Sequence, residues 1–185
     1  MCNEFAQERA WKAYCEMMAR EDVKVVTPEL PELPFTANRR PTDPALVIRA
    51  APGGVAMELM RWGVPKPGSK RPLLWMQGEK RRDPPNARGI VPIEMFVEHR
   101  GEKSPKERFE FRPAINEPLG MATYVKEDRW AHLTVDPGGE VFGIHDRQPA
   151  IIRLSDWWRY LTEPHWPADL IQPSAPGTLK VFQAR

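Results

Sequence analysis

The second residue of the chain is a cysteine, and its position beside the initiator methionine gives it unusual chemistry. Because cysteine is small, Met1 is normally removed in front of it, which leaves a free α-amine and a thiol on Cys2. This 1,2-aminothiol captures aldehydes. The amine, with an ordinary pKa of about 7.7–8.0, forms an imine, and the thiol then closes on the imine carbon to give a five-membered thiazolidine. An internal cysteine such as Cys15 cannot react in this way, and an inert cysteine at a frayed terminus is the alternative interpretation.

Further short motifs follow Cys2 along the chain. They are LMRWGVP at 59–65, NAR at 86–88 and IHDRQP at 144–149, together with FTAN at 35–38 followed by PTDP at 41–44. In this order they resemble the SRAP family, the SOS-response-associated peptidases that process abasic sites in single-stranded DNA. Members of that family typically read M-C-G-R, R-W-G-L-I-P, N-A-R-x-E, L-I-P-A-D-G-F-Y-E-W and I-H-D-R-M-P. The resemblance extends over most of the chain.

The resemblance implies four catalytic residues: Cys2, Asn86, Glu98 and His145. The imidazole of His145 titrates near neutrality and suits the opening of a closed abasic sugar to its aldehyde. A carboxyl must move protons while the imine forms, and burial would raise the pKa of Glu98 toward that task. Glu94 competes with Glu98, but Phe96-x-Glu98 keeps the family's spacing. Asn86 is a neutral donor and acceptor, and a turn residue or helix cap is its alternative role.

DNA contacts are expected from the same motifs. The resemblance assigns them to Asn38, Arg61, Trp62, Arg88 and Arg147, the arginines to phosphates and Trp62 to a stacked base. A core position is the alternative for Trp62. The segment 61–112 carries 13 Lys/Arg against seven Asp/Glu within a chain of net charge +2, which indicates an anionic partner or a solvated basic loop. Binding without base-specific readout and with strong salt dependence is expected.

Several positions depart from the family pattern. Asn3 and Glu4 stand where Gly-Arg is typical, so an acid replaces a basic residue beside the nucleophile. Only five residues separate Asn86 from Pro92, where the family usually has a long basic segment. Met95 replaces a glycine and His99 a tryptophan. These changes predict a divergent member with a reduced DNA-binding surface.

The elements that must position these residues are mostly strands. The 185 residues include 21 prolines and seven tryptophans, which favours one globular domain, 1–185, of strands and loops over long helices. Strands are predicted at 45–49, 55–62, 73–76, 92–99, 108–112, 120–125, 130–135, 141–144, 150–152 and 178–182. Helices are predicted at 4–18, from the stripe Trp11, Tyr14 and Met18, and at 156–161 with Ser155 as N-cap. The expected class is α+β, mostly antiparallel β in a barrel-like SRAP fold, with an N-terminal helix and short peripheral helices.

Composition also limits the function classes. No apolar run approaches a membrane span, the charged N-terminus is not a signal peptide, and two cysteines do not indicate a disulfide framework. The histidines lack metal-ligand spacing, so no metal and no cofactor are expected. We expect a cytoplasmic monomer, nucleoid-associated when bound to DNA.

The leading hypothesis is an enzyme that crosslinks to abasic sites in single-stranded DNA through Cys2. The alternatives are a thiol hydrolase that uses Cys2 and His145, and a non-covalent single-stranded-DNA-binding module.

Overall fold

The computed structural model describes residues 2–27, 36–102 and 104–184. The stretch 28–34, whose repeated prolines predict extended surface chain, lies outside these residues, as does Phe35. The helices are α1 (Trp11–Arg20) and α2 (Trp157–Thr162), and short 3-10 turns are η1 (Gly78–Lys80), η2 (Pro85–Ala87), η3 (Gly139–Val141) and η4 (Leu154–Asp156). The strands are β1 (Phe5–Gln7), β2 (Thr36–Arg39), β3 (Pro44–Ala51), β4 (Gly54–Trp62), β5 (Trp75–Gln77), β6 (Arg88–Ile93), β7 (Met95–Arg100), β8 (Glu107–Pro113), β9 (Leu119–Lys126), β10 (Arg129–Val135), β11 (Gln148–Pro149), β12 (Ile151–Ile152) and β13 (Leu179–Ala184).

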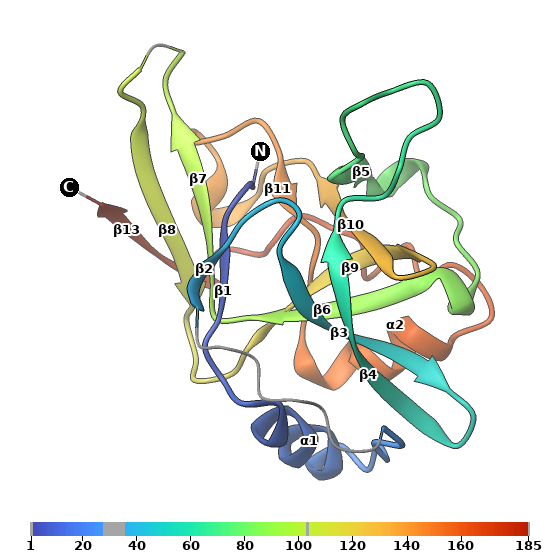
Figure 1. The fold of residues 1–185 in the computed structure, drawn as a ribbon. Helices are drawn as coiled ribbons and strands as arrows, with labels where there is room; N and C mark the ends of the chain where they lie inside the picture. The colour runs from blue at the N-terminus through green and yellow to red at the C-terminus, as the bar shows by residue number, and fades with distance from the viewer. Residues whose placement is uncertain (1, 28–35, 103, 185) are drawn as a thin grey trace.

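The strands form two sheets (Figure 1). The five-stranded sheet has the order β13-β8-β7-β1-β2, and the eight-stranded sheet has the order β11-β10-β4-β3-β6-β9-β12, with β5 paired to β10. Strand β10 pairs with both β4 and β9, so β10, β4, β3, β6 and β9 follow one another in a closed ring. Within the described ranges the named strands pair antiparallel except β10 with β4 and β10 with β5. The expectation of a mostly antiparallel α+β fold is confirmed.

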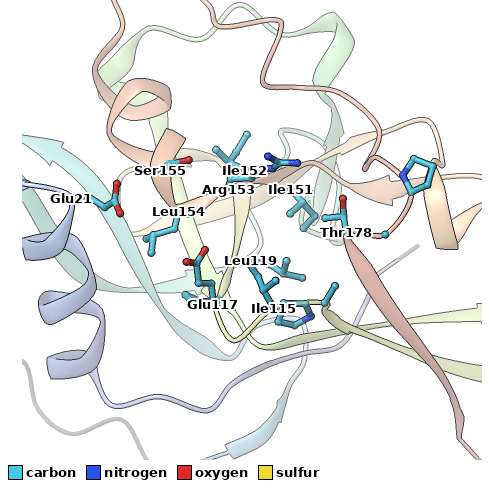
Figure 2. A pocket seen from close by; sticks show the side chains of 15 residues that line it. Glu21, Ile115, Glu117, Leu119, Ile151, Ile152, Arg153, Leu154, Ser155 and Thr178 are labelled. Carbon is cyan, nitrogen blue, oxygen red and sulfur yellow. The ribbon is translucent and has the colours of Figure 1, made fainter.

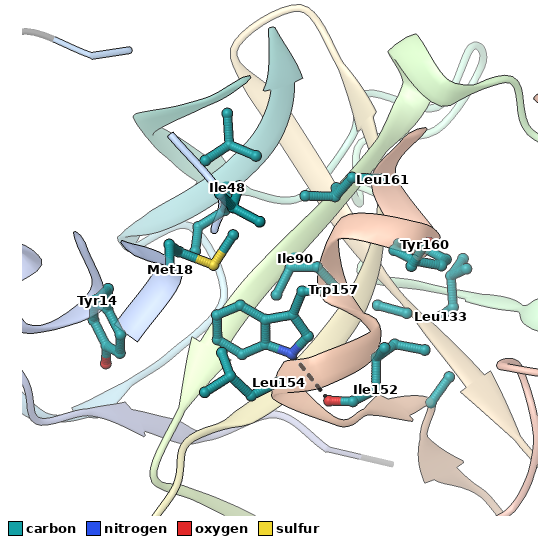
Figure 3. Close-up of a cluster of buried hydrophobic side chains, with 14 of the residues drawn as sticks. Tyr14, Met18, Ile48, Ile90, Leu133, Ile152, Leu154, Trp157, Tyr160 and Leu161 are labelled. Atoms are coloured by element: carbon teal, nitrogen blue, oxygen red, sulfur yellow. Dashed lines mark hydrogen bonds between the residues drawn. The ribbon is translucent and has the colours of Figure 1, made fainter. Parts of the chain in front are cut away.

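One face of the ring strands packs against the two helices. Ile48 of β3 and Ile90 of β6 point to this face, and Met18 of α1 and Trp157 of α2 pack onto it (Figure 3). The indole Nε1–H of Trp157 donates to the Ile152 carbonyl at 3.1 Å, so the ring is buried without losing its hydrogen bond. Tyr14 and Met18 are buried as the sequence stripe predicts.

The opposite face of the ring strands forms a second apolar cluster, and the N-terminus belongs to it. The Trp62 and Trp130 rings stack with centroids 5.2 Å apart, and Phe5 of β1 packs on Trp62 at 5.3 Å. Cys2 lies in the same cluster and is fully buried. Strand alternation explains the separation of the two clusters, because successive side chains of one strand point to opposite faces.

Tertiary pairing changes some predicted boundaries. The first helix begins at Trp11 rather than Glu4, because residues 5–7 form strand β1, and the Gln7 side chain hydrogen-bonds the main chain of Leu46 and Pro92. The single strand predicted at 92–99 is two strands that separate at Glu94 and enter different sheets.

Two local predictions were wrong. Residues 141–144 form a tight turn after η3 rather than a strand, with the Ile144 N–H donating to the Val141 carbonyl at 3.0 Å. Ser155 lies inside η4 and does not cap α2, whose N-cap position is Asp156, without a side-chain capping bond.

Candidate active site at the N-terminus

Strand β1 brings the N-terminal cysteine alongside β7. Phe5 pairs with Phe96 in antiparallel register, and the Val97 N–H donates to the Glu4 carbonyl at 2.9 Å. In an antiparallel pair, each step back from Phe5 matches a step forward from Phe96. Residues before Phe5 therefore run past the part of β7 that carries Glu98.

Cys2 is held as a neutral thiol in this arrangement. Its side chain is fully buried, and the Sγ atom lies 3.4 Å from the Glu4 carbonyl oxygen, to which it can donate. Burial, and secondarily the charge of Glu98, raises the pKa of the Cys2 thiol well above its ordinary value. Since the thiolate is the nucleophilic form, Cys2 needs a base to react from this state.

Glu98 is the carboxyl that lies beside Cys2. Its side chain is buried, and burial raises the pKa of Glu98 to about 7, although a hydrogen bond from the Cys2 main-chain nitrogen acts in the opposite direction. Near neutral pH the carboxyl is therefore present in both protonation states, which suits a group that both gives and takes protons. The hydrogen bond also places the backbone nitrogen of Cys2 next to the carboxyl.

Glu94, the competing glutamate, is engaged elsewhere. Its carboxylate accepts hydrogen bonds from the Tyr14 hydroxyl at 2.9 and 3.1 Å and from the Glu8 N–H at 2.7 Å, and it pairs with Arg9 at 3.1 Å. These contacts tie helix α1 to the junction of β6 and β7. Glu94 therefore has a structural role, and Glu98 is the glutamate near the nucleophile.

His145 faces Glu98 from the loop before β11. Its Nε2 lies 3.7 Å from Glu98 Oε2, while Nδ1 lies 2.8 Å from Asp146 Oδ1 and 3.1 Å from the Arg147 N–H. Burial lowers the pKa of His145, so the ring is neutral near pH 7. A neutral imidazole and a carboxyl that titrates near neutrality can exchange a proton.

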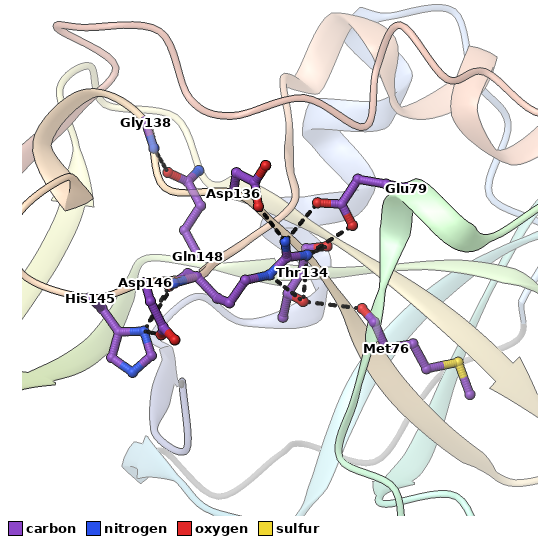
Figure 4. A network of polar contacts seen from close by, with 9 residues as sticks. Met76, Glu79, Thr134, Asp136, Gly138, His145, Asp146 and Gln148 are labelled. Carbon is purple, nitrogen blue, oxygen red and sulfur yellow. Dashed lines mark hydrogen bonds and ion pairs between the residues drawn. The ribbon is translucent and has the colours of Figure 1, made fainter.

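Arg147 fixes the loop that carries His145. Figure 4 shows its partners Glu79, Thr134 and Asp136 close to one another. Its guanidinium pairs with Asp136 at 2.6 Å and with Glu79 at 2.8 Å, and it donates to the Thr134 carbonyl at 2.7 Å. The same hydrogen bond from Arg147 lowers the pKa of Glu79. Arg147 therefore holds the His145 loop against β10 and η1 through paired charges, and its assignment to a DNA phosphate stays a prediction.

His132 is a buried residue that the motif comparison did not single out. It lies on β10 between Trp130 and Thr134, on the face of the second apolar cluster, and its ring meets the edge of Trp62 at 5.6 Å. Burial lowers the pKa of His132 to about 3, although a hydrogen bond with the Leu74 main chain acts in the opposite direction. Its place in the alternating strand 130–135, two residues from Trp130, was the available sequence signal.

Asn86 is not brought to this group of residues. It is exposed on η2, where its carbonyl accepts from Arg49 at 3.1 Å, and β6 runs across the molecule between η2 and the strand that carries Glu98 (Figure 1). Turn η2 instead contacts α2, β3 and β9. The turn role therefore describes the position of Asn86 in this structure.

Two of the residues assigned to DNA are core residues instead. Trp62 is fully buried and donates its Nε1–H to the Leu74 carbonyl at 3.0 Å, so neither ring face is open to a base. Arg88 is 1% exposed, and its guanidinium donates to four main-chain carbonyls, those of Asp83, Tyr160, Glu163 and His165. Arg88 thus joins η2 to α2 and has no donor directed to solvent.

Arg61 and Asn38 remain available to a ligand, since both are exposed.

The acidic residue Glu4, which stands where the family typically has arginine, has local partners in the structure. Glu4 lies 2.6 Å from Arg108 and 3.9 Å from Arg40, so its charge is matched by two arginines of the chain itself.

A separate cleft of about 480 Å³ lies on another part of the surface (Figure 2). Ile151, Leu154 and Leu119 line it together with Glu117 and Arg153, and Cys2, Glu98 and His145 do not.

No three His, Cys, Asp or Glu side chains of the described ranges group closely enough to hold a metal ion. Among those same ranges no helix has the length and apolar character needed to cross a membrane.

Solved structures share this fold. A protein from Bacteroides thetaiotaomicron superposes with a TM-score of 0.77 at 14% identity, covering 100% of this chain and 92% of that one. A protein from Bordetella bronchiseptica gives 0.70 at 17% identity with complete coverage of both chains. A phage-related protein from the same organism gives 0.67 at 16% identity, covering 100% and 94%.

Sequence comparison identifies the family. No curated protein matches the sequence significantly. The family described as SOS response associated peptidase (SRAP) matches residues 1–184. The chain therefore belongs to the SRAP family.

Proposed function

We propose that the mature protein captures abasic sites in single-stranded DNA by forming a thiazolidine with Cys2. The observation that carries the proposal is the contact between the Cys2 backbone nitrogen and the Glu98 carboxyl, with the Nε2 of His145 3.7 Å from that carboxyl. Hydrolysis of the Met1–Cys2 peptide bond turns this nitrogen into an α-amine. Amine, thiol and carboxyl then form one buried group, and the half-buried imidazole borders it.

The atoms of the reaction balance without an oxidant or reductant. The amine adds to the aldehyde carbon of the opened sugar, and Glu98, protonated in part near pH 7, donates the proton with which the hydroxyl leaves as water. Loss of water leaves an iminium with one hydrogen on nitrogen. Glu98, now a carboxylate, takes the proton of the Cys2 thiol and the sulfur bonds to the iminium carbon, which gives the thiazolidine and regenerates the carboxylic acid. His145 is placed to move the proton that opens the sugar ring.

The test is incubation of the mature protein with an oligonucleotide that bears one abasic site, followed by a denaturing gel. We expect a shifted band for the wild type and for Cys15→Ala, the matched control at the other free cysteine. Without a reductant, Cys2→Ala and Cys2→Ser should both give no band, because each keeps the amine but lacks the thiol; borohydride reduction should trap the imine of either variant as a shifted band. Glu98→Gln should slow the reaction. A wild type that leaves the band unshifted would rule out the proposal.

A peptidase activity of the same residues is the second candidate, and the family description favours it. In this reading Cys2 and Glu98 take part in the removal of Met1 itself. Mass spectrometry of protein made in a translation system without methionine aminopeptidase tests this. Loss of Met1 from the wild type and its retention in Glu98→Gln would support self-processing, and retention in both would contradict it.

A further inference from the structure

A rigid turn presents an aromatic side chain three residues before His145. Phe142 has φ −55° and ψ 131°, and Gly143 has φ +82°, the dihedral pattern of a type II turn. The Ile144 N–H closes this turn on the Val141 carbonyl at 3.0 Å, and the His145 N–H donates to the same oxygen at 3.2 Å. A positive φ suits glycine, so the turn fixes the direction of Phe142 relative to His145.

The turn is anchored on both sides. Val141 is fully buried in the second apolar cluster. The Gly138 N–H donates to the buried Gln148 side chain at 2.8 Å, and the Glu140 carboxylate accepts from the Gly177 N–H at 2.6 Å. These contacts tie the turn to β11 and to the segment before β13, so Phe142 projects from a supported platform.

Phe142 is 76% exposed, more than any other large hydrophobic residue in the described part of the chain. Single exposed apolar residues are ordinary on protein surfaces. Phe142 is notable for its position, because the turn that carries it also carries the backbone of His145. A strand whose sugar reaches His145 brings the neighbouring base within reach of the Phe142 ring.

A positively charged side chain lies near His145. Lys106 is exposed in the hairpin between β7 and β8, next to Glu107, which pairs with Arg100 two residues beyond Glu98. Since Glu98 Oε2 lies 3.7 Å from His145 Nε2, the hairpin brings Lys106 toward the imidazole. A nucleotide combines an apolar base face with an anionic phosphate. An exposed aromatic ring and a lysine near one imidazole match both parts.

We propose that Phe142 stacks on the base adjacent to the abasic sugar, and that Lys106 contacts a phosphate of the same strand. This inference rests on the proposed function, because it takes single-stranded DNA as the ligand. Stacking on a phenyl ring is tolerant of sequence, since every base has a π-face. Phe142 thereby supplies the base contact that was expected from Trp62.

The experiment measures non-covalent affinity, so that it does not depend on the crosslink. The probe is a dye-labelled single-stranded oligonucleotide with a tetrahydrofuran abasic analogue, which has no aldehyde, and the readout is fluorescence anisotropy. Phe142→Ala should weaken binding about tenfold. Phe142→Leu should weaken it similarly, because it keeps apolar volume without a ring, and Phe142→Trp should bind at least as tightly as the wild type. Phe182→Ala, at an exposed phenylalanine of β13, is the matched control and should bind normally.

Three results would overturn the inference. They are a Phe142→Ala variant with wild-type affinity, a Phe142→Leu variant that binds normally, and an equal loss in Phe182→Ala. For the phosphate contact, Lys106→Ala should lower the slope of log K against log salt by about one, and an unchanged slope would contradict it. A wild type that binds through Phe142 but never crosslinks natural abasic sites would refute the proposed function and leave the stacking inference standing.

Discussion

Replacing Glu98 by glutamine should change how the stability of the protein depends on pH. The pKa of Glu98 rises from 4.5 to about 7 on folding because the carboxyl is buried. A carboxyl with a raised pKa contributes stability that is fully present below pH 4.5 and is lost as the pH rises through 7, since ionisation inside the protein is unfavourable. At 1.36 kcal/mol per pKa unit, the wild type should lose about 3 kcal/mol across this window. Glutamine has no proton to lose, so the Glu98→Gln variant should not lose stability over this pH range for this reason.

The measurement is urea denaturation followed by tryptophan fluorescence at pH 5, 6, 7 and 8. The free energy of unfolding of Glu98→Gln minus that of the wild type should increase by about 2–3 kcal/mol from pH 5 to pH 8 and should level off above pH 7. Glu102→Gln, at an exposed glutamate, controls for the loss of one carboxylate. A difference that stays constant over this range would show that Glu98 is not a buried proton-binding group, and the acid–base role assigned to it would fail with it.

Three further substitutions test the positions described above. Arg88→Met should lower the free energy of unfolding by about 3–5 kcal/mol, because four main-chain carbonyls, two of them in buried hydrogen bonds, lose their donor. It should not change the salt dependence of DNA binding at temperatures where the variant is folded. Gly89→Ala should cost about 1–3 kcal/mol in a chemical denaturation assay, since its methyl group would lie 2.8 Å from Thr123 Oγ1 and from methyl groups of Val47 and Val125. His132→Leu should gain stability over the wild type as the pH falls from 6.5 toward 3, by about 3 kcal/mol at pH 4, because a histidine with a lowered pKa must stay neutral in the fold while the unfolded chain takes up a proton; equal acid sensitivity of the two proteins would contradict this.

Local sequence patterns identified most of the fold and part of the candidate site. The strands predicted at 45–49 and 55–62 are the two strands of the β3–β4 hairpin, and the stripe of Trp11, Tyr14 and Met18 was sufficient to predict a helix. The residues 5–7 could not be identified in this way, because their strand depends on hydrogen bonds to β2 and β7, which lie far away in the sequence. The break at Glu94 between β6 and β7 could not be identified for the same kind of reason.

Position within a motif did not predict whether Arg88 and Trp62 are exposed to solvent. Arg88 and Trp62 lie in motifs that resemble family motifs, yet the structure uses one to satisfy main-chain carbonyls and the other to fill an apolar cluster. A motif specifies residue types along the chain. It does not specify which of them remain open to solvent once the sheets have closed over them.

The sequence by itself determined the family and the strand-rich class, because motif order and proline content are properties of the covalent chain. Only the tertiary structure decided which carboxyl lies beside Cys2, that His145 meets it and that Asn86 does not. It also decided that Glu98 titrates near neutrality, since the pKa of a carboxyl depends on the solvent and charges around it. Those surroundings exist only when β1, β7 and the His145 loop have packed together.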